Sequence, residues 1–193
     1  MAVSRKLKQL SLATIYPVQD LTVFTILAML MFAAAASAAP AVQPGTLCQT
    51  GERVIFSCPV KNATRLVSIC GSKALTDKRG YLQYRFGRAG KIELAFPEEP
   101  QGSQHMFRYA HYIRPQVDRF SVGFTIDGHT YEVFKNYEGD SEPKIHEAGI
   151  FITLPDGKNV EILCVGPEKG NLHEIKSVVP CDPDNALNLG ECP

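Results

Sequence analysis

The chain has 193 residues, of which 20 are Lys or Arg and 20 are Asp or Glu, so its formal net charge at pH 7 is zero. This balance excludes the class of nucleic-acid-binding proteins that depend on a strong excess of basic residues. A hydrophobic fraction of 45% beside 21% charged residues excludes a wholly disordered chain, and the length is that of one domain with room for a short appendage.

The first 38 residues have the features of an export signal. Basic residues near the N-terminus precede an apolar run of 16 residues from Leu21 to Ala36, and an Ala-Ser-Ala motif ends at Ala38. As a helix the run would reach about 24 Å, less than the roughly 30 Å of membrane hydrocarbon, which favours cleavage over a retained membrane anchor. We therefore predict a signal peptide over residues 1–38, no stable membrane span after cleavage, and a periplasmic or secreted protein.

Cleavage after Ala38 changes the charge of the mature chain. The signal contains three basic residues and one acidic residue, so 17 basic and 19 acidic residues remain, with a net charge of −2. A nearly neutral chain gives no electrostatic reason to expect a polyanionic partner, and we predict no nucleic-acid binding.

The six cysteines all lie in the predicted mature chain: Cys48, Cys58, Cys70, Cys164, Cys181 and Cys192. An even number of cysteines in an exported chain predicts disulfides. A zinc site is the alternative, but it would need close pairs such as C-x-x-C, and no two cysteines are closer than ten residues. We expect Cys181 to pair with Cys192 in a C-terminal tail of residues 173–193, and the other four to tie the N-terminal strands to one another and to the strand ending at Cys164.

Residues 39–172 alternate between apolar and polar side chains and are divided by turn-forming residues. This pattern predicts an antiparallel, hairpin-rich all-β domain, a sandwich or a barrel, with about nine strands and no helix of ten or more residues. The predicted hairpins pair 53–58 with 65–70, 81–86 with 91–96, 120–126 with 129–135 and 150–154 with 159–164, with one more strand at 106–113.

The turns of the last three hairpins also predict their registers. We place loops at residues 88–90, 127–128 and 155–158, each of which ends with or contains a glycine. The expected cross-strand pairs are Phe86–Ile92, Tyr84–Leu94, Leu82–Phe96 and Arg85–Glu93, then Phe124–Tyr131 and Val122–Val133, and finally Phe151–Ile162 and Thr153–Val160.

Three common catalytic signatures are missing from the sequence: there is no G-x-S-x-G, no H-E-x-x-H and no phosphate-binding G-x-x-x-x-G-K-[ST]. The histidines are spread along the chain, and we expect each to be structural or exposed: His105, His111, His129, His146 and His173. We therefore predict no catalytic residue, no metal ligand and no cofactor.

Three surface features are weaker candidates. Glu98 and Glu99 lie in a proline-flanked loop, and residues 138–142 form an acidic loop without regular calcium-ligand spacing, so we interpret both as solvated surface. A polar outer strand surface would be a recognition site or an ordinary exposed face: Tyr81, Gln83, Arg85, Lys91 and Glu93.

Several segments resemble a family of small exported bacterial proteins of unknown function. They are Phe-Ser-Cys at 56–58, Ser-Ile-Cys at 68–70, Gly-Tyr-Leu-Gln-Tyr-Arg-Phe-Gly at 80–87 and Gly-Lys-Ile-Glu-Leu-Ala-Phe-Pro at 90–97. The resemblance covers about residues 48–97 and implies bacterial export and a disulfide-bonded β domain. It implies no activity.

These features favour a non-catalytic binding or inhibitor-like module of the bacterial envelope, whose partner is an envelope or extracellular protein or a glycan. The alternative is a secreted hydrolase whose site is assembled from several strands. A cleft with converging carboxylates, or a His–carboxylate pair, would favour the enzyme.

Overall fold

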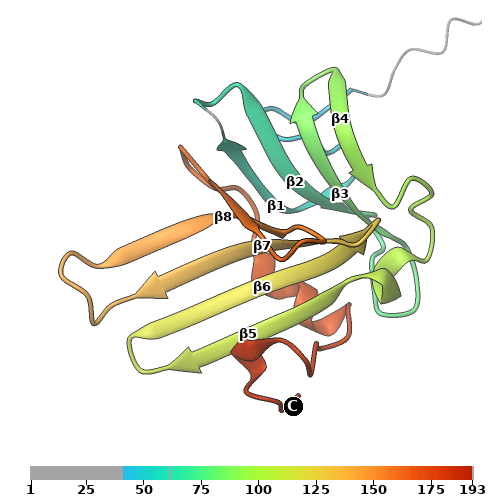
Figure 1. Ribbon diagram of the computed structural model, residues 1–193. Helices are drawn as coiled ribbons and strands as arrows, with labels where there is room; N and C mark the ends of the chain where they lie inside the picture. The colour runs from blue at the N-terminus through green and yellow to red at the C-terminus, as the bar shows by residue number, and fades with distance from the viewer. Residues whose placement is uncertain (1–40, 61, 193) are drawn as a thin grey trace, which may run out of the picture. The chain divides into compact units, whose positions relative to one another are not determined.

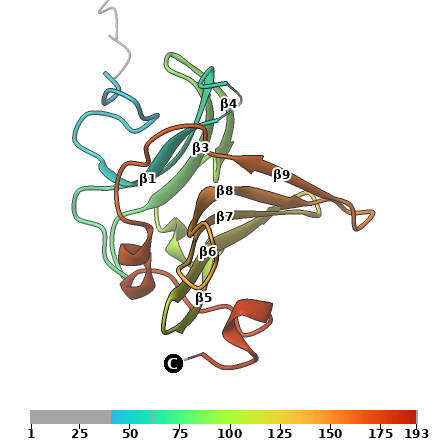
Figure 2. The same cartoon turned by 90° about the vertical axis from the view of Figure 1, so that its left-hand side faces the viewer.

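Two antiparallel β-sheets contain all the strands of residues 41–60 and 62–192, the part of the chain that the computed structural model describes (Figures 1 and 2). The all-β prediction is confirmed, since helical structure in these residues is limited to three short 3₁₀ segments. In the same residues, no helix is long and apolar enough to cross a membrane. The predicted signal peptide of residues 1–38 lies outside the described residues.

The two sheets follow each other along the chain. The first has the order β1-β2-β3-β4 and the second β5-β6-β7-β8-β9, so within each sheet every strand pairs with its neighbours in sequence. The bounds are β1 Arg53–Val60, β2 Arg65–Gly71, β3 Leu82–Arg88, β4 Lys91–Phe96, β5 Arg108–Arg114, β6 Val117–Ile126, β7 His129–Glu138, β8 Ile145–Thr153 and β9 Asn159–Leu163. The 3₁₀ segments are η1 Ser103–Met106, η2 Leu172–Ser177 and η3 Ala186–Asn188.

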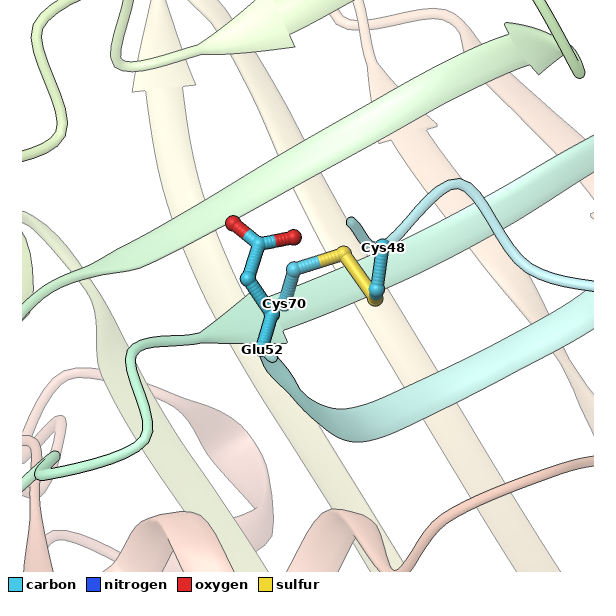
Figure 3. Close-up of side chains that lie close together, drawn as sticks. All are labelled: Cys48, Glu52 and Cys70. Carbon is cyan, nitrogen blue, oxygen red and sulfur yellow. A yellow bond between two sulfur atoms is a disulfide. The ribbon is translucent and has the colours of Figure 1, made fainter. Parts of the chain in front are cut away.

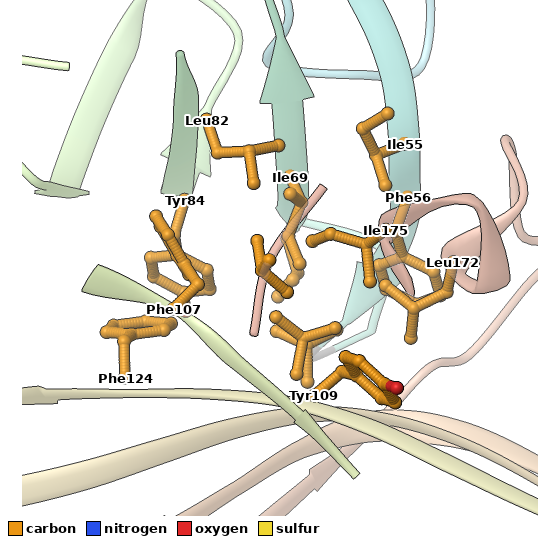
Figure 4. Packing of buried hydrophobic residues seen from close by; sticks show 14 of the residues in the cluster. Ile55, Phe56, Ile69, Leu82, Tyr84, Phe107, Tyr109, Phe124, Leu172 and Ile175 are labelled. Atoms are coloured by element: carbon orange, nitrogen blue, oxygen red, sulfur yellow. The ribbon is translucent and has the colours of Figure 1, made fainter. Parts of the chain in front are cut away.

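The sheets pack face to face, and in Figure 1 the strands of one sheet run across those of the other. Their facing sides supply one core, to which the first sheet contributes Phe56, Ile69 and Tyr84 and the second sheet contributes Phe124 (Figure 4). The rings of Tyr84 and Phe124 have centroids 4.8 Å apart. Large apolar side chains at alternate positions of both sheets therefore make the fold a β-sandwich.

Segment η2, at the start of the tail, contributes to the same core. Leu172 and Ile175 of η2 are 1% and 0% exposed and lie beside residues of β1 and β2 (Figure 4). Further along, the tail runs beside the open edge of β5: Tyr109 N–H donates to the Pro180 carbonyl at 3.0 Å, and Asp182 N–H donates to the Tyr109 carbonyl at 2.8 Å. The tail thus covers an edge strand that would otherwise be open to pairing with another chain.

The six cysteines form three disulfides, and the predicted Cys181–Cys192 pair is one of them. Cys48 pairs with Cys70 of β2, and Cys58 of β1 pairs with Cys164, the residue after β9. The last of these joins the first strand of one sheet to the end of the other sheet. Disulfides of this kind are typical of proteins that fold in an oxidising compartment.

The hairpin at Asp127-Gly128 has the predicted register, with Phe124 opposite Tyr131 and Val122 opposite Val133. The hairpin of β8 and β9 does not: Ile150 faces Ile162 and Ile152 faces Val160, one residue away from the prediction. Its turn is tighter than expected, because Leu154 N–H donates to the Lys158 carbonyl at 2.8 Å and only three residues remain in the loop. Because the loop has one residue fewer than predicted, the residues that face each other across the hairpin differ by one position from the prediction.

The hairpin of β3 and β4 also differs from its predicted register. Phe86 faces Leu94 and Tyr84 faces Phe96, because a β-bulge shifts the register between Phe86 and Gly87. A Cβ atom at Gly87 would lie 2.7 Å from the backbone nitrogen of Glu93, so the bulge requires glycine. The aromatic face is preserved, but the predicted Arg85–Glu93 pair is wrong, since Arg85 lies opposite Ala95.

Candidate binding groove

A groove of about 620 Å³ crosses the outer face of the second sheet, on the side away from the core. Its floor follows from strand register. Cross-strand partners in alternate rows of β6, β7, β8 and β9 place their side chains on this face. The rows that line it are Ser121–Phe134, Arg119–Asn136–Glu147 and Glu132–Phe151–Glu161.

One side of the groove is formed by the tail. Asn185, Ala186 and Leu187 line it at η3. Asn185 Nδ2 donates to Glu132 Oε1 at 2.8 Å, which ties the tail to β7. Asn188 is buried, and it accepts from His111 N–H at 2.9 Å through Oδ1 while its amide donates to the Asp182 carbonyl at 2.6 Å. These bonds and the Cys181–Cys192 disulfide hold the groove's side in place.

The groove is acidic. Four glutamates line it against a single arginine, and Arg119 already pairs with Glu138. Glu147 and Glu161 are exposed and have no salt bridge among the described residues. A cationic group entering the groove would therefore meet carboxylates whose charge is not neutralised by the protein.

Two features of the floor distinguish it from an ordinary exposed strand surface. Burial raises the pKa of Glu132, more than the hydrogen bond from Asn185 lowers it. Ser121 is 2% exposed, and its hydroxyl is the one buried side-chain polar atom of the described residues that lacks a hydrogen-bond partner. An unpaired buried hydroxyl costs about 1–3 kcal/mol.

Part of the polar outer surface predicted on β3 and β4 is buried. Arg85 and Gln83 are 6% and 8% exposed, because residues 41–52 fold over the outer face of the first sheet. Arg85 forms a two-pronged salt bridge with Glu52, at 2.7 Å and 2.8 Å, and its Nη1 also donates to the Leu47 carbonyl at 2.8 Å. The partner of Glu93 is Arg65, at 2.8 Å.

Glu52 also lies beside the Cys48–Cys70 disulfide, and the three side chains cluster closely (Figure 3). Both sulfurs are used in the disulfide and the carboxylate is used by Arg85, so this cluster is structural. Burial alone would raise the pKa of Glu52. Hydrogen bonds from Arg85, Tyr81 and the Gln49 N–H outweigh burial and lower that pKa below its usual 4.5.

This lowered pKa predicts acid sensitivity. The carboxylate of Glu52 stabilises the fold fully above about pH 4.5, and the stabilisation is lost as the pH falls through the lower pKa of the folded state, because the unfolded state binds the proton first. We expect the free energy of unfolding, measured in urea at pH 6, 4 and 3, to fall less steeply in Glu52→Gln than in the wild type. Equal slopes would contradict this role for Glu52.

The remaining sequence candidates divide between structure and surface. The acidic loop at 138–142 is used in salt bridges: Glu138 pairs with Arg119, and Asp140 pairs with Arg114 at 2.6 Å. Glu98 and Glu99 are exposed, as predicted.

Sequence reasoning missed one association among the histidines. His111 and His173, 62 residues apart, both contact Asp118, at 2.9 Å and 3.2 Å. Burial lowers the pKa of His111, against the opposing effect of the hydrogen bond that its ring donates to Asp118. No short-range motif marks this cluster, because its members come from two strands and the tail.

No protein-family model matches the chain, and comparisons with curated proteins and with solved structures found no match. The resemblance of residues 48–97 to small exported proteins therefore stays a prediction.

Proposed function

We propose that the protein is an exported, non-catalytic binding module of the bacterial periplasm or exterior, and that its outer groove binds a cationic segment of an envelope or extracellular protein. The observation that carries the proposal is the acidic groove, in which Glu147 and Glu161 have no basic partner among the described residues. The export signal expected in residues 1–38 and the three disulfides support the location.

The shape and composition of the groove fit an extended peptide. Its length runs across several strands, its floor presents Phe134 and Phe151, and glutamates lie around these rings. Lysine and arginine side chains have apolar stems and charged ends, so their stems would pack on the phenylalanine rings while the charges reach the carboxylates.

The test compares two charge-matched double variants. A peptide of ten residues rich in lysine is titrated by calorimetry into the oxidised protein, and Glu147→Gln with Glu161→Gln should weaken its binding about fivefold, since two charge contacts contribute on the order of 1 kcal/mol in total. The same loss of charge outside the groove, in Glu98→Gln with Glu99→Gln, should leave binding within about twofold.

Two results would contradict the proposal: binding of an acidic peptide as tight as that of the lysine peptide, or equal binding by the two double variants. Raised salt should weaken the specific binding, because exposed charges are screened. Binding of a neutral oligosaccharide in place of either peptide would instead identify a glycan partner.

A second candidate, a secreted glycoside hydrolase, is favoured by the raised pKa of Glu132, the property of a general acid. Glu132 and Glu161 lie in one row with Phe151 between them, so their strands are about 9.5 Å apart. Inverting hydrolases hold their two carboxyl groups about 6.5–9.5 Å apart. Turnover of an oligosaccharide that Glu132→Gln abolishes would support this candidate and overturn the non-catalytic one.

A further inference from the structure

A cluster of side chains at the end of β5 and β6, on the face opposite the groove, carries an inference independent of the proposed function. We propose that His111, Asp118 and His173 form a binding site for a divalent transition-metal ion of the Zn²⁺ type. Two imidazoles and one carboxylate are a donor set that such ions prefer, and three protein ligands leave a coordination position open.

The backbone places the first two ligands together. In the register of β5 and β6, His111 faces Phe120 and Ile113 faces Asp118, so His111 and Asp118 are diagonal neighbours on one face of the sheet. Along β6, the apolar side chains that face the core end at Phe120, and the strand continues beyond this residue. The two polar side chains therefore lie at the margin of the core, where water still reaches them.

The third ligand is fixed by the tail. Leu172 and Ile175 anchor η2 in the core, and His173 lies between these two anchors in the sequence. Asn171 caps the segment by accepting a hydrogen bond from His173 N–H at 3.2 Å. The ring of Phe120 lies 4.4 Å from the ring of His173 and 5.2 Å from that of His111, so it supports both imidazoles.

The donor atoms already converge. His111 Nε2 lies 2.9 Å from Asp118 Oδ1, His173 Nε2 lies 3.2 Å from Asp118 Oδ2, and one donor atom from each of the three residues lies within 4.8 Å of the others. Ligands of a tetrahedral ion with bonds of about 2.1 Å stand about 3.4 Å apart. Small side-chain rotations would bring the three atoms to that spacing.

The position of Lys176 works against metal binding by His111. Its Nζ lies 3.0 Å from His111 Nδ1. An ammonium group can only donate, so Nδ1 accepts and the proton of the neutral ring stays on Nε2, the atom that faces Asp118. An ion bound to Nε2 would need the proton on Nδ1, and the exposed lysine would have to turn away. Lysine thus competes with the metal for His111.

Because of this competition, substitutions at the site should change the affinity for Zn²⁺ in opposite directions. Zn²⁺ alone is titrated into the full oxidised protein by calorimetry, and we expect one ion per chain. His173→Gln and Asp118→Asn should each weaken binding about tenfold or more, as changes even to supporting groups of metal ligands do. Lys176→Met should strengthen it severalfold, and His105→Gln, an exposed histidine outside the cluster, should leave it unchanged.

His111 itself is not substituted, because its side chain is 12% exposed and packs on Phe120. Thermal unfolding in the presence of a chelator checks that each variant folds, and NMR of the histidine rings in wild-type protein should show shifts of His111 and His173 on adding Zn²⁺, without shifts of His105. The proposal is overturned if Zn²⁺ does not bind, if both ligand variants bind as wild type does, or if Lys176→Met leaves affinity unchanged.

Discussion

Removing the Cys58–Cys164 disulfide should lower the free energy of unfolding by about 4.7 kcal/mol. The bridge closes a separation of 106 residues, and in the chain-entropy model a loop of that length restricts the unfolded chain by about this amount. The bridge also joins β1 to the end of the second sheet, so the sandwich loses the disulfide that links its two sheets. The double variant Cys58→Ala, Cys164→Ala, measured by urea unfolding, tests the expectation.

The matched control is the tail disulfide. Cys181 and Cys192 are 11 residues apart, and their loop predicts a stabilisation of about 3 kcal/mol. Replacing this pair with alanine should therefore cost less than replacing the other, and should loosen mainly the tail beside β5. An equal or larger loss from the tail pair would show that loop length does not govern the stability of this fold.

Glu52→Gln should lower the free energy of unfolding by about 3–5 kcal/mol, the usual cost of leaving one member of a buried ion pair without its partner. The Arg85 side chain is 8% exposed. In the variant its guanidinium would keep the Leu47 carbonyl as a partner but would lose the negative charge that compensates its own. Tyr81, which donates to Glu52 at 2.7 Å, would lose a charged acceptor as well.

The control uses an exposed pair on the same sheet. Arg65 and Glu93 form a salt bridge at 2.8 Å with side chains 28% and 26% exposed, so water replaces a lost partner. Glu93→Gln should cost a small fraction of the loss found for Glu52→Gln. A similar loss in both variants, measured by urea unfolding at pH 7, would contradict the view that residues 41–52 bury the Arg85–Glu52 pair.

Strand positions were predictable from sequence because alternation and turn chemistry are local. Asp127-Gly128 determines its hairpin to the residue, since both positions take positive φ angles of 47° and 77°, as a two-residue turn demands. Where a loop could close in more than one way, as at 155–158, the register was wrong by one residue, and the bulge at Gly87 has no signal in the alternation.

Neither the groove nor the histidine cluster could be predicted, for a related reason. The side of the groove comes from Asn185 to Leu187, and His173 comes from η2, so both depend on where a polar tail docks. The burial of Arg85 likewise depends on residues 41–52, whose docking is fixed by a disulfide and by one ion pair. Contacts across such sequence distances leave no periodic pattern.

Mapping a bound peptide onto the outer groove tests the proposed function most directly. Backbone NMR spectra of the oxidised protein, recorded during addition of the lysine-rich peptide, should show the largest shifts at outward-facing residues of β7, β8 and β9, around Phe151 and Glu161, and at Asn185. Shifts confined to the first sheet, or no shifts at saturating peptide, would contradict the proposed function.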